Sequence, residues 1–245
     1  LRLGLWLWNA RFTLCRSISG DRMKYKLNDI YPTVQGEGCN TGTPMTVVRL
    51  HGCGVGCSFC DTKETWLSNP KLQVDSIEKA IAISGAWCEV TAEEIADYAC
   101  ELPYGGINWV MLTGGEPAEQ DLSYLCDALH RLEFKVALET SGTALGHVAS
   151  GADWVCISPK IDMPGGKAIL REAVLCANEM TWVVGKEKDL ENLTAFLTKH
   201  ELPASVEVCL QPMSQNKKAT ELCIETCMQT GWRLSAQMHK YLELR

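Results

Sequence analysis

Two kinds of hydrophobic pattern alternate along most of the chain. Short apolar, β-branched runs predict buried strands, whereas apolar residues at helical spacing predict amphipathic helices. We expect strands at residues 28–38 (ending in a glycine-bounded turn), 45–51, 108–112, 135–139, 154–158, 180–184, 206–210 and 232–234. We expect helices at residues 74–83, 91–102, 121–132, 167–177, 190–199 and 219–230.

Local signals support this order of elements. Thr91 followed by Glu94 forms a capping-box pattern that predicts a helix start. Strands that alternate with helices indicate parallel pairing with right-handed crossovers. The sequence therefore predicts an α/β fold in which ligands bind at the carboxyl ends of the strands.

Composition limits the classes of function. The 245 residues, 46% of them hydrophobic, suffice for one α/β domain with a sizeable core. A net charge of −7 argues against direct nucleic-acid binding, which depends on Lys and Arg at phosphates. Thirteen cysteines is an odd number in a chain of this length, and we expect a reducing cytoplasm rather than a secreted disulfide scaffold.

Three of the cysteines form the most distinctive motif. Cys53, Cys57 and Cys60 have C-x3-C-x2-C spacing, with Gly54 and Gly56 between them. Thiolates suit iron–sulfur clusters, zinc and Cu(I). A [4Fe–4S] cluster takes four ligands, so three cysteines leave one iron free. Two alternatives stay open: zinc with a fourth ligand from His51 or Asp61, and three buried thiols without a chemical role.

Polar motifs follow several of the predicted strands. They are Thr-Gly-Gly-Glu-Pro at 113–117, Glu-Thr-Ser-Gly at 139–142, Ser-Pro-Lys at 158–160 and a polar turn at 211–215. Each can be a plain strand-to-helix turn or a helix N-cap. Because parallel strands end at the same edge of a sheet, we expect these motifs to share one site with the cysteines.

The cysteine spacing with Phe59 before the last cysteine resembles the cluster loop of radical S-adenosylmethionine (SAM) enzymes. Together with the segments Pro-Thr-Val-Gln-Gly-Glu-Gly at 32–38 and Asp-Thr-Lys at 61–63, the motifs resemble the 7-carboxy-7-deazaguanine synthase family of queuosine biosynthesis, in its short enteric form. The resemblance extends from Met23 to the C-terminus. It implies a partial (β/α)6 TIM-like barrel, open on one side.

The resemblance also implies cofactors and site residues. Cys53, Cys57 and Cys60 would bind a [4Fe–4S] cluster whose open iron is chelated by SAM, and Thr62 would bind Mg2+. The implied SAM contacts are Phe59, Gly115, Glu116, Ser141, Ser158, Pro159, Lys160 and Gln211. The implied substrate contacts are Val34, Gln35, Gly36, Glu37, Arg49, Thr113 and His239.

The implied reaction is a radical ring contraction of 6-carboxy-5,6,7,8-tetrahydropterin to 7-carboxy-7-deazaguanine, with loss of ammonia. The implied partners are a flavodoxin or ferredoxin as reductant and a second copy in a homodimer. We expect a cytoplasmic enzyme without membrane contact. A glycyl-radical activase and a zinc-binding interaction module are the alternatives, and the Cys223–Cys227 pair is not expected to bind an auxiliary cluster.

Residues 1–22 stand apart from this pattern. Residues 1–8 are apolar except for Arg2, a run too short to cross a bilayer, and no small-residue cleavage site follows it. We expect residues 1–22 to be a non-native or disordered extension, and residues 23–245 to form the radical SAM domain.

Overall fold

A computed structural model describes residues 23–146, 148 and 150–243. The expectation for residues 1–22 lies outside the described residues. The strands are β1 (Lys24–Val34), β2 (Pro44–Leu50), β3 (Gln73–Val74), β4 (Trp87–Thr91), β5 (Trp109–Gly114), β6 (Lys135–Thr140), β7 (Trp154–Ile157), β8 (Glu179–Val184), β9 (Glu207–Pro212) and β10 (Arg233–Leu234). The α-helices are α2 (Ile77–Ala82), α3 (Ala92–Glu101), α4 (Ser123–Arg131), α5 (Arg171–Leu175), α6 (Glu187–His200), α7 (Lys217–Thr230) and α8 (Met238–Tyr241).

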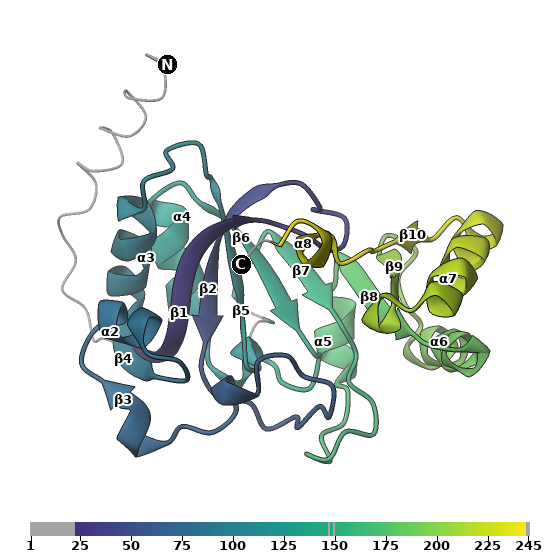
Figure 1. Cartoon of the computed structure of the whole chain (residues 1–245), viewed down its shortest axis with the longest axis horizontal. Coiled ribbons are helices and arrows are strands. Elements are labelled where there is room, and N and C mark those ends of the chain that lie inside the picture. Colours follow the sequence, from purple (N-terminus) through teal and green to yellow (C-terminus); the bar gives the residue numbers. More distant parts are fainter. Residues whose placement is uncertain (1–22, 147, 149, 244–245) are drawn as a thin grey trace.

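All described strands belong to one sheet of order β10-β9-β8-β7-β6-β5-β2-β1-β4-β3. The strands from β2 through β10 in this order pair in parallel. The sheet curves without closing, and Figure 1 shows its two ends at opposite sides of the molecule. This is the partial barrel that the resemblance implied.

The first strand departs from the parallel pattern. β1 pairs antiparallel with both β2 and β4. Only residues 35–43 join β1 to β2, and a connection this short joins antiparallel neighbours, whereas parallel strands need a longer crossover. The expectation of parallel pairing was therefore wrong for β1, and the strand β4 was not predicted.

The predicted helices form with changed limits. Thr91 Oγ1 accepts a hydrogen bond from Glu94 N (3.2 Å), and Glu94 Oε2 accepts one from Thr91 N (2.7 Å), which confirms the capping box. The helix expected at 167–177 is only α5, Arg171–Leu175. The segment before α5 packs on the cysteine loop instead. Its contact with the loop is a hydrogen bond from Gly165 N to Val55 O, 3.0 Å long.

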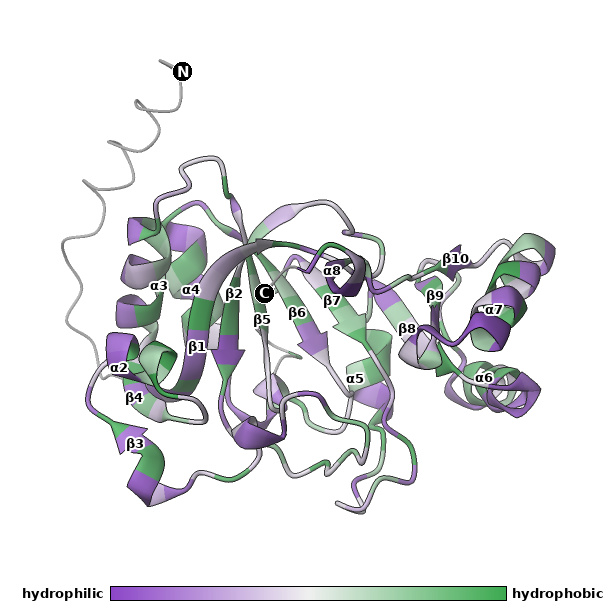
Figure 2. Ribbon diagram, viewed as in Figure 1, coloured by the Kyte–Doolittle hydropathy of each residue, from purple (hydrophilic) through white to green (hydrophobic). Residues whose placement is uncertain are grey.

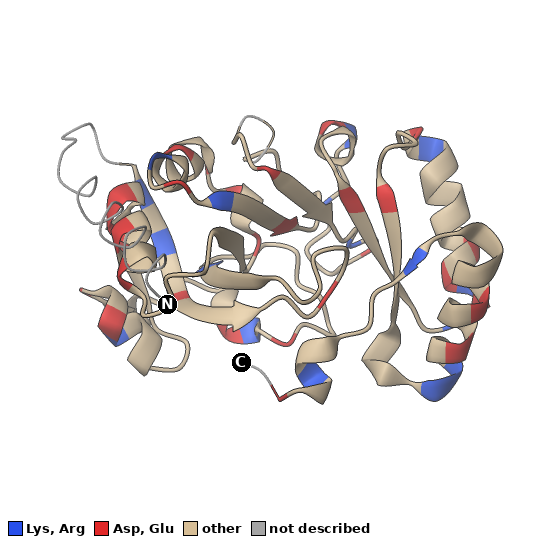
Figure 3. Cartoon of the chain, turned by 90° about the horizontal axis from the view of Figure 1, so that it is seen from above, with Lys and Arg blue, Asp and Glu red and all other residues tan. Residues whose placement is uncertain are grey.

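The two faces of the parallel sheet have different side chains. One set of alternate residues, including Val110, Leu112, Val136, Leu138 and Leu210, packs in the main apolar core with residues of α2–α7. The residues between them, such as Met111, Thr113 and Glu139, face a cavity. The same strands therefore contribute side chains to both the core and the cavity. Figure 2 shows hydrophilic colour near the carboxyl ends of β2 and β6. Figure 3 shows charged residues of both signs on the peripheral helices and others on strands and connecting loops.

None of the helices in the described part of the chain combines the length and apolar character needed to cross a bilayer.

Candidate active site

A cavity of about 590 Å³ lies on the inner face of the curved sheet. This volume is within the range of small-molecule and cofactor sites. Of the site residues expected from sequence, those that line the cavity are Val34, Gln35, Gly36, Glu37, Arg49, Cys53, Cys57, Phe59, Cys60, Thr62, Thr113, Gly115, Glu116, Ser141, Ser158, Lys160, Gln211 and His239. Pro159 does not line it. The motifs at the strand ends therefore share one site.

The cysteine loop forms one wall of this cavity. Cys57 is buried, while Cys53 and Cys60 are partly exposed. Burial raises the pKa of both the Cys53 and Cys57 thiols, and Lys160 opposes this shift at Cys57. The Cys60 sulfur lies 3.3 Å from Trp66 Nε1 and 3.4 Å from Thr62 N, two donors that point at it. Such N–H groups tune sulfur ligands of iron–sulfur clusters.

The spacing of the three sulfurs tests which metal group fits. They do not all lie within 4.8 Å of one another. A single tetrahedral zinc, with Zn–S near 2.3 Å, brings its sulfurs to about 3.8 Å apart. At least one sulfur pair is wider than 4.8 Å, which disfavours a single zinc bound by all three cysteines. His51 is buried away from the cavity, with Nε2 3.1 Å from Leu67 O and its ring stacked on Trp87, so it does not complete a zinc site.

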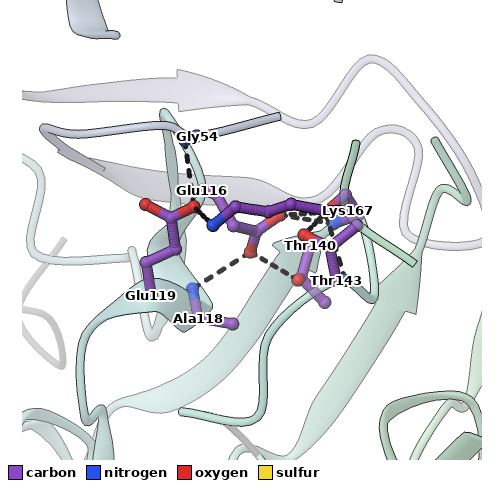
Figure 4. Close-up of polar contacts among 8 residues, drawn as sticks. Gly54, Glu116, Ala118, Glu119, Thr140, Thr143 and Lys167 are labelled. Carbon is purple, nitrogen blue, oxygen red and sulfur yellow. Dashed lines mark hydrogen bonds and ion pairs between the residues drawn. The ribbon is translucent and has the colours of Figure 1, made fainter. Parts of the chain in front are cut away.

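Neighbouring segments hold the cysteine loop in position (Figure 4). Glu119 Oε1 accepts a hydrogen bond from Gly54 N at 2.9 Å and pairs with the Lys167 ammonium. A Cβ at Gly165 would lie 1.9 Å from Gly54 O. Only a glycine at 165 permits this contact, so the segment before α5 is a second support for the loop.

The Thr-Gly-Gly-Glu turn after β5 packs directly on the start of the cysteine loop. A Cβ at Gly114 would lie 2.0 Å from Leu50 O, and one at Gly115 would lie 2.1 Å from Gly52 O. Glu116 N donates to Gly52 O at 2.9 Å. The glycines therefore allow the ends of β2 and β5 to touch, in addition to the SAM contact that the resemblance implied for Gly115.

The Glu116 carboxylate is buried and fully engaged (Figure 4). It accepts hydrogen bonds from Thr140 Oγ1 at 2.6 Å, from Ala118 N at 3.0 Å, and from Ser141 N at 2.8 Å as well as from the Ser141 hydroxyl. Burial of a carboxylate is tolerated when it is hydrogen-bonded in this way. Glu116 thus joins the ends of β5 and β6.

Basic and aromatic side chains border the cavity beside the cysteine loop and on β2. Lys160 Nζ donates to Ser158 Oγ at 2.6 Å and lies 5.9 Å from the centre of the Phe59 ring, which is 54% exposed. On the inner face of β2, Arg49 donates from Nη2 to the Tyr31 hydroxyl at 3.1 Å. Both cations border the cavity and are available to an anionic ligand.

Residues 35–39, hereafter the closing turn, reach from β1 across the open side of the barrel. Met238 N donates to Gly36 O at 2.9 Å, and Gln237 Nε2 donates to Glu37 Oε1 at 2.8 Å. The His239 ring lies 3.8 Å from Glu37. A Cβ at Gly36 would lie 2.7 Å from His239 N, which explains the glycine. The closing turn and α8 together cover the cavity.

Two acids on the inner face had been given no role: Glu139, which belongs to the motif at 139–142 that was expected at the site, and Glu179, which no motif included. Glu139 accepts from Gln35 Nε2 at 3.3 Å, and burial together with nearby Glu179 raises its pKa to about 8. Its partial exposure is to the cavity that it lines. Glu179, the first residue of β8, is 2% exposed. Successive side chains of a strand point to opposite faces of the sheet. This alternation along β6 and β8 was the sequence signal that could have placed both acids on the cavity face.

Comparisons with known proteins agree with this geometry. The family model described as the Radical SAM superfamily matches residues 47–160. The 7-carboxy-7-deazaguanine synthase of Escherichia coli (strain K12) is 40% identical over 224 residues, 91% of this chain and all of that protein. The synthase of Buchnera aphidicola subsp. Schizaphis graminum is 38% identical over 226 residues, with the same coverage.

A solved structure is similar as well. The crystal structure of QueE from Escherichia coli superposes with a TM-score of 0.82 at 36% identity, over 96% of this chain and 98% of that one. The chain therefore belongs to the radical SAM superfamily and, within it, to the 7-carboxy-7-deazaguanine synthase family.

Proposed function

We propose that this protein converts 6-carboxy-5,6,7,8-tetrahydropterin to 7-carboxy-7-deazaguanine with loss of ammonia, using a [4Fe–4S] cluster, SAM and Mg2+. The observation that carries the proposal is the composition of one cavity. It has the three cysteines on one wall and, on its inner-strand wall, a cation and a largely buried acid, Arg49 and Glu139. Arg49 complements the carboxylate at one end of a carboxylated pterin, and Glu139 complements the N–H donors of its 2-amino-4-oxo ring.

The residues expected at SAM surround the cysteine loop. When bound, the cluster and SAM supply the 5′-deoxyadenosyl radical that takes hydrogen from C6 of the pterin. Lys160, already hydrogen-bonded to Ser158, is suited to the methionyl carboxylate. Phe59, with its exposed ring, offers an apolar surface to the nucleoside, whereas Pro159, also expected at SAM, does not line the cavity. Gly115, Glu116, Ser141 and Gln211 complete the expected set.

Arg49 and Glu139 determine the substrate's orientation in this proposal. The planar fork of Arg49 pairs with the substrate carboxylate. The 2-amino-4-oxo ring of a pterin carries adjacent N–H donors, which an ionised Glu139 accepts together. Gln35, hydrogen-bonded to Glu139, reads the neighbouring carbonyl. Val34, Gly36, Glu37, Thr113 and His239 form the surrounding wall.

Thr62 is the proposed protein ligand of Mg2+. Its hydroxyl lies 3.6 Å from the Cys60 sulfur, at the cavity edge next to the expected cluster. A single neutral hydroxyl does not hold Mg2+, which prefers several oxygen ligands and keeps waters. Substrate oxygens and water must therefore complete the site, so Mg2+ binding and substrate binding are coupled.

The test is an anaerobic assay of the reconstituted protein with SAM, dithionite, Mg2+ and 6-carboxytetrahydropterin, followed by mass spectrometry. We expect both 5′-deoxyadenosine and 7-carboxy-7-deazaguanine, with the second lost in Cys57→Ala and retained in Cys88→Ala, a buried thiol outside the site. Deoxyadenosine without the deazaguanine would reject the substrate and favour a glycyl-radical activase. A colourless protein that retains zinc would favour an interaction module.

The partners remain predictions. A flavodoxin or ferredoxin is the expected reductant, a homodimer the expected assembly, and the cytoplasm the expected compartment. Reduction of the cluster by each carrier under anaerobic conditions, and light scattering of the loaded protein, test the first two.

A further inference from the structure

Two thiols and a carboxylate meet outside the cysteine loop, where the closing turn touches the far strands. They belong to Cys39 in the closing turn, Glu179 in β8 and Cys209 in β9. One ligand atom from each lies within 4.8 Å of the other two, and the sulfurs of Cys39 and Cys209 are 3.7 Å apart. The proposed reaction uses none of these three side chains.

The site is largely buried, and Glu179 also lines the cavity. Cys209 is fully buried, Glu179 is 2% exposed, and Cys39 is half-buried. Thiolates and carboxylates in such surroundings need a cation or a set of donors to remain charged.

The carboxylate is held in place before any ion arrives. Glu179 Oε2 accepts hydrogen bonds from Cys39 N at 3.0 Å and from Trp154 Nε1 at 3.1 Å. Its Oε1 accepts from Thr181 Oγ1 at 3.1 Å. A Cβ at Gly38 would lie 2.0 Å from Oε1, so glycine at this position lets the turn approach. Partners of this kind orient metal ligands in proteins.

The 3.7 Å distance between the Cys39 and Cys209 sulfurs is the distance expected when both bind one small thiophilic ion. A tetrahedral zinc with Zn–S bonds of about 2.3 Å separates two sulfurs by about 3.8 Å. A disulfide would require about 2.05 Å. We propose that Cys39, Cys209 and Glu179 form a second metal site, which takes a single d10 cation of the zinc class independently of the cysteine loop.

An ion explains the trio better than a redox disulfide does. Burial and the Glu179 charge raise the pKa of Cys39 to about 11 and also raise that of Cys209. Protonated thiols are poor nucleophiles in disulfide exchange. A bound dication would displace both thiol protons to solvent and offset the charges of the two thiolates, while the hydrogen bonds to Glu179 stabilise the remaining negative charge. No electron is transferred in this step.

The ion would connect distant parts of the chain. Cys39 is 170 residues from Cys209 and lies at the end of the closing turn. Tying this turn to β8 and β9 would hold the cover of the cavity against the open side of the barrel. Three protein ligands leave the fourth tetrahedral position to water or a small thiol.

The test uses the cluster-loaded protein under anaerobic conditions with Zn2+ alone as the probe. The protein is dialysed against buffered zinc, and bound zinc and iron are counted by mass spectrometry. X-ray absorption at the zinc edge then identifies the ligands. The variants are Cys39→Ser, which changes a half-buried side chain, and Glu179→Gln, with Cys88→Ala as the control for loss of a buried thiol.

We expect one zinc per chain beside the full iron content, with two sulfur neighbours near 2.3 Å and oxygen neighbours near 2.0 Å. Cys39→Ser should weaken zinc binding by about a hundredfold and Glu179→Gln by about tenfold or more, while Cys88→Ala should match the parent chain. If the parent chain binds no zinc, or if Cys39→Ser retains it with unchanged affinity, the proposal is wrong. Neither result would bear on the pterin reaction.

Discussion

Glu139 is an acid whose surroundings keep it protonated near neutral pH. Burial and the charge of Glu179 raise its pKa from 4.5 to about 8. Protonation of the folded state therefore contributes stability that is complete below about pH 4.5 and is lost as pH rises through 8. A substrate that donates two hydrogen bonds to the ionised acid must displace this proton.

Glu139→Gln should therefore change stability and substrate binding in opposite directions. The free energy of unfolding should rise by about 2–4 kcal/mol at pH 9, with little change near pH 5, since each unit of pKa difference is worth about 1.4 kcal/mol. The KM for the pterin should rise at least about tenfold, because one acceptor becomes a donor. Denaturant titrations at both pH values and steady-state kinetics measure the two effects.

An unchanged KM in Glu139→Gln would remove Glu139 from the substrate site. A stability difference that does not grow between pH 5 and pH 9 would show that the acid is already ionised in the folded chain.

Thr62 gives a second prediction at this scale. Thr62→Ala should abolish the response of turnover to added Mg2+, whereas the parent chain dialysed against a chelator should recover about tenfold or more in kcat/KM when Mg2+ returns. The spectrum of the reduced cluster should stay the same in the variant, because Cys60 keeps its Trp66 donor. Equal Mg2+ responses in both proteins would assign the ion to other ligands.

At the scale of elements, the cysteine loop depends on its neighbours as much as on its own residues. Glu119 in the 3-10 turn Pro117–Glu119 and Lys167 before α5 hold Gly54, and Gly165 packs on the same backbone. The predicted longer helix at 167–177 is absent because this segment supports the loop. A loop held from outside keeps its ligands aimed at one position.

Glu119→Ala should weaken this support. It leaves Gly54 N and Lys167 without their acceptor, so we expect the cluster to be lost several-fold faster on exposure to a chelator. The decay of the cluster's visible absorbance measures the rate. Glu93→Ala, which removes the exposed ion pair with Arg131, is the matched control and should not change it. Equal decay in both variants would contradict a supporting role.

The elements were more predictable than their contacts. β-branched runs located the parallel strands, and the capping pattern located α3, because both signals are local in sequence. The short connection between β1 and β2 was a local sign of antiparallel pairing that the strand–helix pattern overrode, whereas the pairing of β1 with β4 depends on residues far along the chain. Among site residues, the motifs identified Ser141 but gave no sign that its hydroxyl and N–H are bonded to Glu116.

At the scale of the whole molecule, the turn of an antiparallel hairpin covers the open side of a partial barrel. β1 and β2 lie within the sheet, and the closing turn between them meets β8, β9 and α8 on the other side. No pattern in the sequence indicates this crossing, because its contacts join residues that are 140 to 200 positions apart. The cavity is therefore a property of the complete chain.

A chain that ends at Ser235 tests this arrangement. It loses Gln237, Met238 and His239, which contact Glu37 and Gly36, but keeps the sheet and the cysteine loop. We expect normal iron content and continued SAM cleavage, with at least about a tenfold lower ratio of deazaguanine to deoxyadenosine, because water enters the uncovered cavity. If the shortened chain gives the same ratio of deazaguanine to deoxyadenosine as the parent chain, α8 is not needed to keep water from the radical.

The alternation of side chains on the strands has a consequence for mutation and descent. Changes at 110, 112, 136 and 138, which pack against helices, should alter how much folded protein a cell accumulates. Changes at 111, 113 and 139, which face the cavity, should alter turnover in protein of normal abundance. Saturation mutagenesis that measures protein abundance and product formation separately should thus distinguish the core-facing positions from the cavity-facing positions, which alternate along each strand. On such strands a lineage can acquire new chemistry at every second residue while it inherits its architecture unchanged.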